Sequence, residues 1–464
     1  MKDITLRRMR TFVKTAAVVA AVALLPVSSP AVAEPVQDDL QLHTTLLPVG
    51  ARIPTLGELQ RSGAAGLEAM DREAGVFSEP HRAPEVVGPA ATHGRIDRQA
   101  SALAPQPTPG FATAAVTYPA PARTLTPKEC ITGLGTDKKF FIKSRYAACS
   151  GAVFFSVWLR NNRPVGETQF VYLSIGTIAK DSRAVRMTQY FTEMKKTGSV
   201  ATSGLMITPK VKVPKVWPST ARVTQAGAVP GARSFDALAA QQSVGFTRTL
   251  NAAAGQGTGR DDAIASVFEA SATVTPPPGY RPSGELSGSL FFLPPRWDKA
   301  SYLKVPAGAA VFTYVVPLHY SSRAGAPERA VAEHLKTAFT NPAGTKPSNA
   351  AKKVPGQNTQ APLHRLYYDN ARRKKNRSTA VSTCKREFGP NYAAGGKECD
   401  EYPFATTYEG CAQPTYEPSA PRNNFSVRAL PGTDNSNAGN LLGQFLTLNR
   451  IVDGKDDGFY VSVS

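Results

Sequence analysis

The chain has 464 residues and a formal net charge of +19 at pH 7, from 54 Lys and Arg against 35 Asp and Glu. This length exceeds that of a typical single domain, so we expect more than one. The charge excludes few functions, but it favours polyanionic partners such as nucleic acid, anionic cell-wall polymers or lipid headgroups. Simple solubility is the remaining explanation of the charge.

Residues 1–33 are typical of a secretory signal peptide. Basic residues precede an apolar run from Ala16 to Leu25, which is too short to span a bilayer as a helix. Ala31-Val32-Ala33 has the small residues of a cleavage site. We therefore expect a mature chain that begins at Glu34, is secreted to the extracellular space and has no stable membrane insertion. The alternative is an uncleaved membrane anchor.

Residues 34–125 are rich in Ala, Pro and charged residues and show little apolar periodicity. This composition predicts a largely disordered or extended segment. Within it, the spacing of Leu56, Leu59 and Leu67 predicts a short helix from Leu56 to Glu73.

Residues 126–325 contain short runs of β-branched and aromatic residues, separated by Pro, Gly and Asn. This pattern predicts a β-rich domain with an antiparallel, sandwich-like fold. The expected strands are Val153–Leu159, Phe170–Ile178, Ser266–Val274, Leu286–Leu293 and Val311–Leu318. The region has no catalytic constellation, so a binding or stabilising role is its default interpretation.

Residues 326–361 are expected to form a helix from Glu328 to Phe339 and then a linker rich in Pro, Gly, Lys and Asn. A basic run follows the linker. It contains Arg372, Arg373, Lys374, Lys375 and Arg377. Such a run can bind DNA by neutralising backbone phosphates, while a solvated helix face or a processing site explains it equally well.

The five cysteines can form disulfides if the chain is exported. Cys130 and Cys149 are close in sequence and predict one pair. Among the other three, we favour a bridge between Cys384 and Cys399, which would brace the acidic segment that follows. A bridge between Cys384 and Cys411 is nearly as plausible.

The most informative segment is an acidic motif, Cys399-Asp400-Glu401-Tyr402-Pro403-Phe404-Ala405, followed by Glu409-Gly410. Further on stands Asp434-Asn435-Ser436-Asn437-Ala438-Gly439. Carboxylates and amides without a nearby histidine suit a hard divalent cation such as Mg²⁺, Mn²⁺ or Ca²⁺.

The second segment opens a helical pattern, in which Leu441, Phe445 and Leu448 recur at helical spacing. Asp434, Asn435 or Ser436 can cap this helix, and Asn437, Asn440 and Gln444 share a polar face on it. Strand-like alternation occurs before the helix, over Asn424–Leu430, and after it, over Phe459–Val463. The order predicts a small α+β module of a hairpin or strand, a helix and a strand.

Together these residues resemble the NucA/NucB deoxyribonuclease family, in which an Asp-Glu-aromatic-Pro motif precedes Glu-Gly and an Asp-Asn-x-x-Ala-Gly segment. The resemblance covers about residues 364–464, within an expected C-terminal domain of residues 362–464. It implies a multidomain chain whose C-terminal module is a ββα-metal nuclease that cleaves DNA with Mg²⁺ or Mn²⁺ as cofactor.

The resemblance also implies roles for particular residues. Asp400 matches the base that activates water, and Glu401 and Glu409 match the other acids of the motif. Asn435 matches the metal-binding amide, and Gln444 stands where a second metal-binding residue is expected. Many ββα-metal nucleases use a histidine as the base, but none of the six histidines here lies in the matching position.

We therefore predict an enzyme, a secreted metal-dependent endonuclease that hydrolyses phosphodiester bonds in DNA. Little sequence preference is expected, because no base-reading motif is visible and phosphate contacts carry no sequence information. The alternative is a non-enzymatic secreted protein that binds envelope polymers or other polyanions and carries an inactive C-terminal module. The intact set of acids and amides favours the enzyme.

Overall fold

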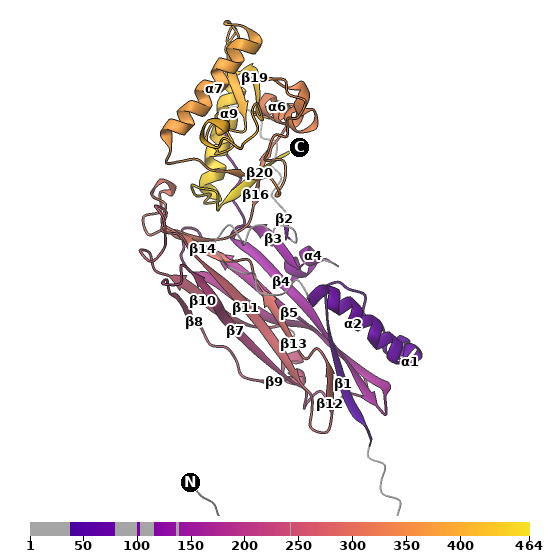
Figure 1. Ribbon diagram of the computed structural model, residues 1–464. Coiled ribbons are helices and arrows are strands. Elements are labelled where there is room, and N and C mark those ends of the chain that lie inside the picture. Colours follow the sequence, from indigo (N-terminus) through magenta and orange to yellow (C-terminus); the bar gives the residue numbers. More distant parts are fainter. Residues whose placement is uncertain (1–37, 79–99, 103–115, 136–138, 242) are drawn as a thin grey trace, which may run out of the picture. The chain divides into compact units, whose positions relative to one another are not determined.

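The computed structural model describes residues 38–78, 100–102, 116–135, 139–241 and 243–464 (Figure 1). The expected signal peptide and its cleavage site lie outside these residues. Residues 39–464 form one compact unit. Among the described residues, no helix has the length and the apolar character needed to cross a membrane.

Two sheets form the larger part of the fold, residues 39–315, which we call the β-body (Figure 1). The first sheet has the order β12-β1-β4-β5-β6-β10-β8, with β3 beside β4 and β2 beside β3. Its strands are β1 (Leu40–Leu47), β2 (Ala100–Ala102), β3 (Phe140–Ser144), β4 (Ala147–Arg160), β5 (Arg163–Ile178), β6 (Val185–Gly198), β8 (Val223–Ala226), β10 (Ser243–Ala252) and β12 (Arg281–Gly284).

The second sheet has the order β15-β14-β11-β7-β9, with β13 beside β11. Its strands are β7 (Met206–Trp217), β9 (Arg233–Ser234), β11 (Ile264–Thr275), β13 (Ser287–Phe291), β14 (Pro295–Asp298) and β15 (Ala309–Phe312). One buried cluster contains Phe154 and Tyr172 from the first sheet and Phe268 and Trp297 from the second. The predicted β-rich sandwich is therefore confirmed, and its pairings are antiparallel except β1 with β12 and β2 with β3.

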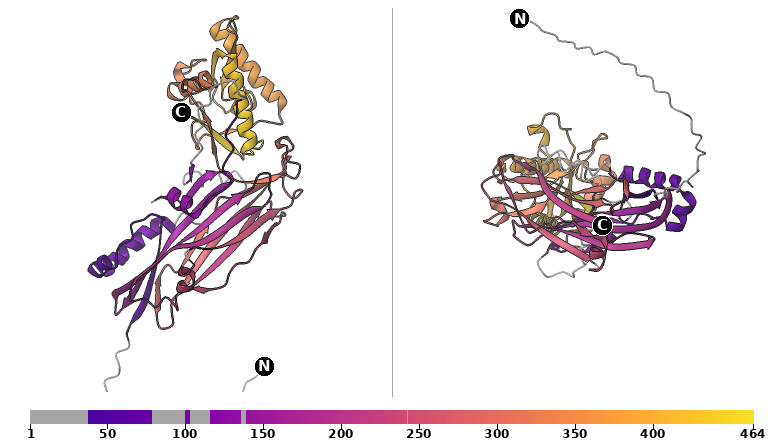
Figure 2. Two further views of the ribbon diagram at one scale, coloured as in Figure 1. Left: turned by 180° about the vertical axis from the view of Figure 1, so that it is seen from behind. Right: turned by 90° about the horizontal axis from the view of Figure 1, so that it is seen from below.

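The outer face of the first sheet is covered by helices, which lie in indigo and violet against it in Figure 2. These are α1 (Leu56–Ser62), α2 (Ala64–Ser78) and α4 (Pro127–Leu134). Val153 and Phe155 of β4 pack there with Leu59 and Leu134. Because both faces of β4 are covered, its sequence is apolar almost throughout and does not alternate.

Two stretches before residue 321 differ from the sequence-based expectation. Residues 40–78, expected to be largely disordered, form β1 and two helices, because Leu42 and Leu46 of β1 enter the core of the sandwich. The helix expected from Leu56 to Glu73 is present but is interrupted at Gly63. The strand expected at Val311–Leu318 is two strands: β15 stays in the β-body, whereas β16 (Val316–Tyr320) joins another sheet.

Residues 316–464 form what we call the C-terminal module. Its first sheet has the order β16-β20-β17, and its second is the antiparallel pair β18-β19. Its strands are β16, β17 (Leu363–His364), β18 (Lys397–Tyr402), β19 (Ser426–Pro431) and β20 (Gly458–Val463). Its helices are α6 (Arg329–Thr340), α7 (Asn370–Phe388), α8 (Gln413–Tyr416) and α9 (Gly432–Leu448). The module also contains the short 3₁₀ helix η3 (Pro342–Gly344), and the β-body contains the short helical segments α5 (Phe235–Ala239) and η2 (Ser301–Leu303).

The stretch expected to be a linker, Thr340–Ala361, packs onto this module. Lys352 is 3% exposed, and its Nζ donates to Thr345 Oγ1 at 2.9 Å and to Pro347 O at 2.5 Å. Burial lowers the pKa of Lys352 to about 8. Lys346 forms a backbone bridge with Val427 on β19. These contacts fix the stretch against the pair β18-β19.

A buried ionic network links the β-body with the C-terminal module. Asp457, beside β20, accepts hydrogen bonds from Arg145 and Arg296 of the β-body. Arg450 of the module binds Asp298 of the β-body in turn. All five side chains are at most 5% exposed.

Candidate functional site

The acidic motif lies on β18, where successive side chains point to opposite faces of the pair β18-β19. One face, with Cys399 and Glu401, packs against α7, since Cys399 is bonded to α7 and Glu401 pairs with Arg377. The other face carries Asp400 and is covered by α6. The two adjacent carboxylates of the motif are therefore separated by the sheet.

Asp400 is 5% exposed and is held by a histidine. His334 of α6 contacts Asp400 Oδ2 through Nδ1 at 2.6 Å. The other ring nitrogen of His334, Nε2, lies 2.7 Å from the hydroxyl of Ser426 on β19. Because a carboxylate only accepts hydrogen bonds, Nδ1 carries the proton, and Ser426 donates to Nε2 when the ring is neutral.

Glu401 is also buried, at 9% exposed, and Arg377 of α7 donates to its Oε2. Burial raises the pKa of Glu401 to about 7, and the negative charge of Asp400 adds to the rise, while Arg377 opposes it. A carboxyl group in such an environment holds its proton near neutral pH. Its place on the α7 side separates it from the surroundings of Asp400.

Glu409 fixes the short strand β17. Its Oε2 accepts from the backbone N–H of His364 at 2.9 Å, and its Oε1 contacts Nδ1 of the same residue at 2.8 Å. Both oxygens of Glu409 are thus engaged by one residue, which is the pattern of a bracing carboxylate.

Asn435 lies in the first turn of α9 and contacts an acid that the sequence interpretation overlooked. Its Nδ2 donates to Glu398 Oε2 at 2.7 Å. Glu398 precedes Asp400 by two residues on β18 and therefore shares its face. Glu398 is exposed and Asn435 is half-buried, so these oxygen-bearing side chains are accessible to solvent.

Arg428 adds a cation to the same face. It lies on β19 directly opposite Asp400, and residues paired in this way project their side chains on one face with Cβ atoms about 4.5–5.5 Å apart. Arg428 is exposed, and no ion pair or side-chain hydrogen bond joins it to another described residue.

Two predicted assignments on α9 change. Gln444 donates through Nε2 to Val116 O at 2.7 Å and accepts through Oε1 from Tyr118 N at 2.9 Å. Its amide therefore holds a backbone segment and is not free to bind a metal. The expected cap residues Asp434, Asn435 and Ser436 lie inside α9, which begins at Gly432 after the N-cap Pro431 and has no side-chain cap. Asp434 Oδ2 instead accepts from Ala330 N at the start of α6 at 3.0 Å.

The basic run lies on α7, but its five cations differ in their surroundings. Arg372 is 6% exposed and binds Glu417 at 2.7 Å, so burial removes it from the candidate DNA contacts. Arg373 bonds Asn370, and Arg377 is engaged by Glu401. Lys374 and Lys375 are exposed and remain available to a phosphate backbone. The helical period explains why some of these cations are buried and others exposed, because one side of α7 packs on the antiparallel pair β18-β19.

Both expected disulfides are present. Cys130–Cys149 joins α4 to β4, and Cys384–Cys399 joins α7 to β18. Cys411 is free and buried, and burial raises the pKa of its thiol well above the usual value. The alternative pairing of Cys384 with Cys411 is thereby excluded.

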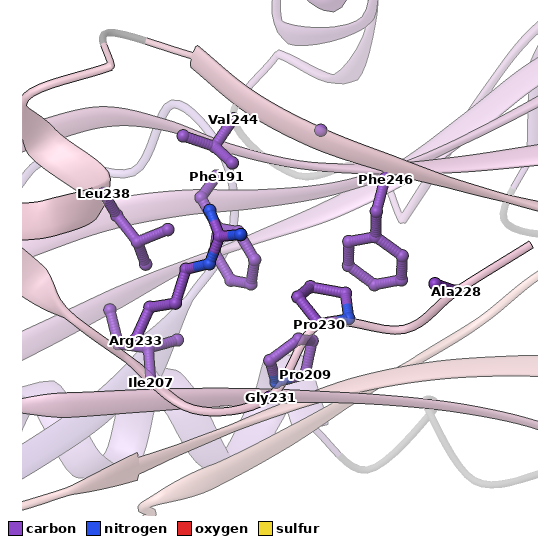
Figure 3. Close-up of a pocket in the computed structure, with 11 residues that line it drawn as sticks. Phe191, Ile207, Pro209, Ala228, Pro230, Gly231, Arg233, Leu238, Val244 and Phe246 are labelled. Carbon is purple, nitrogen blue, oxygen red and sulfur yellow. The ribbon is translucent and has the colours of Figure 1, made fainter.

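No three acidic, histidine or cysteine side chains among the described residues gather closely enough to hold a metal ion. A cavity of about 290 Å³ lies instead in the β-body, far from the motif in sequence (Figure 3). Apolar side chains such as Phe191, Leu238 and Phe246 line it, with Arg233 as its one charged lining residue. It contains no carboxylate and none of the predicted site residues, so it offers neither a base nor ligands for a hard cation.

The face of β18-β19 that carries Asp400 therefore combines a buried carboxylate, an exposed guanidinium and an acid–amide pair. The family model described as Deoxyribonuclease NucA/NucB matches residues 351–462. The C-terminal module thus carries a NucA/NucB domain, and the resemblance inferred from the sequence is confirmed. The match covers less than half of the chain and leaves the β-body unassigned. No curated protein and no solved structure matches the chain.

His334, Glu398 and Arg428 surround Asp400 but were not among the residues that the sequence predicted for the site. Glu398 could have been found, because alternation along one strand places it on the face of Asp400, whereas the position of Arg428 depends on the pairing of β18 with β19. His334 lies 66 residues before Asp400, and nothing local in the sequence indicates that contact.

Proposed function

We propose that this protein is a secreted, metal-dependent endonuclease that hydrolyses phosphodiester bonds in DNA. One observation carries the proposal: the segment that matches the family contains Glu398, Asp400 and Arg428 on one face of a hairpin, beside the first turn of α9. The order of β18, β19 and α9 is that of a ββα-metal nuclease, and we propose this relationship for the module.

Asp400 is the proposed general base. Because His334 occupies Oδ2, the second oxygen Oδ1 would accept the proton of the attacking water. The water oxygen then bonds to phosphorus, and the bond between phosphorus and the leaving sugar oxygen breaks. The leaving oxygen takes a proton from solvent.

Arg428 is the proposed contact to the scissile phosphate. Its place opposite Asp400 would hold the phosphate next to the base, and a guanidinium can bind two phosphate oxygens at once. We assign no chemical step to Glu401 or Glu409, because Arg377 and His364 engage them; they brace β18 and β17 instead.

Glu398 and Asn435 are the proposed holders of a divalent metal. The hydrogen bond between them leaves Glu398 Oε1 and Asn435 Oδ1 without a hydrogen-bond partner among the described residues. Oxygen donors of this kind fit Mg²⁺ or Mn²⁺, and Mg²⁺ commonly takes only one or two carboxylates together with water and substrate phosphates. A bound ion would neutralise negative charge that develops on the phosphate and the leaving oxygen.

The remaining parts of the proposal concern DNA binding and export. Lys374 and Lys375 supply phosphate contacts without sequence information, which supports cleavage with little sequence preference. Two disulfides support folding in an oxidising compartment and hence secretion.

A plasmid-nicking assay tests the proposal. We expect the full-length protein to convert supercoiled DNA to nicked and linear forms with Mg²⁺ or Mn²⁺, and excess EDTA to abolish the reaction. Asn435→Ala and Glu398→Gln should raise the metal concentration needed for half-maximal rate, whereas the half-exposed control Glu333→Gln should not. Cleavage that persists in EDTA would contradict the metal dependence. DNA binding without cleavage in any metal would favour the non-enzymatic polyanion-binding alternative.

A further inference from the structure

Helix α6 lies outside the segment that matches the family, yet it reaches the proposed base. The match begins at residue 351, whereas α6 spans Arg329–Thr340. From this helix His334 contacts Asp400, and the histidine side chain is 2% exposed.

The packing of α6 shows that this helix is an integral part of the C-terminal module. Val331, Ala332, Leu335 and Ala338 are each 0–1% exposed and belong to the main core. Helices that move as lids bury little apolar area, and this one buries a whole face.

The two ends of α6 are fixed as well. At its start, Asp434 of α9 accepts from the backbone N–H of Ala330, and Asn437 donates to Pro327 O at 3.1 Å. Near its end, Phe339 packs edge-on against Tyr402 of β18, with ring centroids 5.2 Å apart. The position of His334 is therefore set by α9 and β18, the elements that carry the proposed site.

A continuous chain of hydrogen bonds runs from Ser426 through His334 to Asp400. Ser426 is fully buried, so its hydroxyl has a fixed environment and can hold the imidazole in the form that carries its proton on Nδ1. The imidazole in turn occupies Oδ2 of Asp400 and leaves Oδ1 as the free oxygen of the carboxylate.

We propose that His334 is a positioning residue for Asp400, so that the catalytic unit begins before the family segment and includes α6. The inference rests on the proposed function. His334 touches neither water nor phosphate in this role; it fixes the rotamer of the base and selects the oxygen that accepts the proton.

Single-turnover cleavage by full-length variants tests this role. His334→Leu removes the donor and should lower the cleavage rate about 10–100-fold, the size of loss typical when a metal-ligating side chain loses the hydrogen-bond partner that orients it. DNA affinity should stay within about twofold, because no phosphate contact is lost. His334→Asn keeps an N–H near the position of Nδ1 and should recover most of the rate.

Two further measurements separate positioning from a purely structural effect. Leu335→Ala removes core packing from the same helix, so it should lower the melting temperature without lowering the rate well below that temperature. In an Asp400→Asn background, His334→Leu should cause no further loss, because the two residues act as one unit.

The hydrogen bond between His334 and Asp400 can also be detected without measuring cleavage, so this inference can be tested separately from the proposed function. Nitrogen NMR of the metal-free protein should show His334 with its proton on Nδ1, and a proton on Nε2 alone would overturn the inference. A wild-type rate in His334→Leu would also overturn it. A faster rate would show that α6 inhibits the site, and additive losses in the double variant would show that the residues act independently.

Discussion

Replacing Asp457 should destabilise the whole compact unit, because this carboxylate is the meeting point of the buried ionic network. Asp457 is 1% exposed and accepts from Arg145 at 2.7 Å and from Arg296, which are 0% and 2% exposed. Its Oδ2 also accepts from Val452 N at 3.0 Å. Asp457→Asn keeps the shape but removes the carboxylate that Arg145 contacts, while Arg296 and Arg450 keep their ion pairs with Asp298.

The expected loss of unfolding free energy is about 3–5 kcal/mol, the usual cost of removing one partner from a buried ion pair. The hydrogen bond of Arg145 to Phe312 O and that of Arg296 to Arg450 O survive and keep the loss within this range. The neighbouring Asp456→Asn makes the same charge change at an exposed position and should stay within about 0.5 kcal/mol of wild type.

Urea titrations with two probes measure the effect. All three tryptophans, Trp158, Trp217 and Trp297, lie in the β-body, so their fluorescence reports that part, and hydrogen exchange in α9 reports the C-terminal module. We expect both midpoints to fall together in Asp457→Asn. Urea midpoints of Asp457→Asn that match those of Asp456→Asn would refute the reasoning. It would also be refuted if the C-terminal module of Asp457→Asn unfolded at lower urea while the tryptophan midpoint stayed at the wild-type value.

Three further predictions concern protons, DNA and disulfides. The pKa of Glu401 is about 7 in the folded protein, above the usual 4.5, so between these pH values the folded protein keeps a proton that the unfolded chain releases. In EDTA, the free energy of unfolding should therefore fall by up to about 1.4 kcal/mol per unit as the pH rises from 4.5 to 7, and Glu401→Gln should remove this slope. Replacing Lys374 and Lys375 with Ala should reduce the salt dependence of DNA affinity by up to about 1.8 in log–log slope, and an unchanged slope would exclude them as contacts. Replacing Cys384 and Cys399 with Ser opens a loop with a separation of 15 residues and should cost about 3 kcal/mol in urea unfolding; a cost near zero would show that the bridge is dispensable.

Local patterns in the sequence were sufficient for much of the fold. Alternating and continuous apolar runs identified β4, β5, β11 and β20, and helical spacing identified α6 and α9. In contrast, β7 contains Pro209 and Pro214, which argue against a strand. The two prolines are tolerated because one edge of β7 pairs only with the two-residue strand β9, so few of the backbone N–H groups along that edge are needed for pairing.

The boundaries of the C-terminal module depend on long-range pairing, which no local pattern reveals. β16 pairs in parallel with β20, more than a hundred residues later, so the module begins well before residue 362. A fragment that starts at residue 362 would lose β16 and α6 and would expose Asp457 and Arg450 without their partners in the β-body. We therefore expect the full chain, and not this fragment, to be the stable unit.

Residues of the candidate site could be predicted where their positions depend on a single strand, but not where they depend on packing between distant segments. The motif itself identifies Asp400, and the alternation along β18 separates it from Glu401 and adds Glu398. The displacement of Gln444 from the site follows from its contact with Val116, which lies more than three hundred residues earlier. The role of His334 likewise arises only from the packing of α6 on the hairpin.

The most direct measurement is the single-turnover rate of duplex cleavage by full-length Asp400→Asn at saturating Mn²⁺, beside wild type and the half-exposed control Glu333→Gln. Loss of a general base typically costs about a hundred- to ten-thousand-fold in rate. We predict a fall of that size for Asp400→Asn, with unchanged DNA affinity and melting temperature, no rescue by additional metal, and a wild-type rate for Glu333→Gln. A rate for Asp400→Asn close to that of wild type would contradict the assignment of Asp400 as the base.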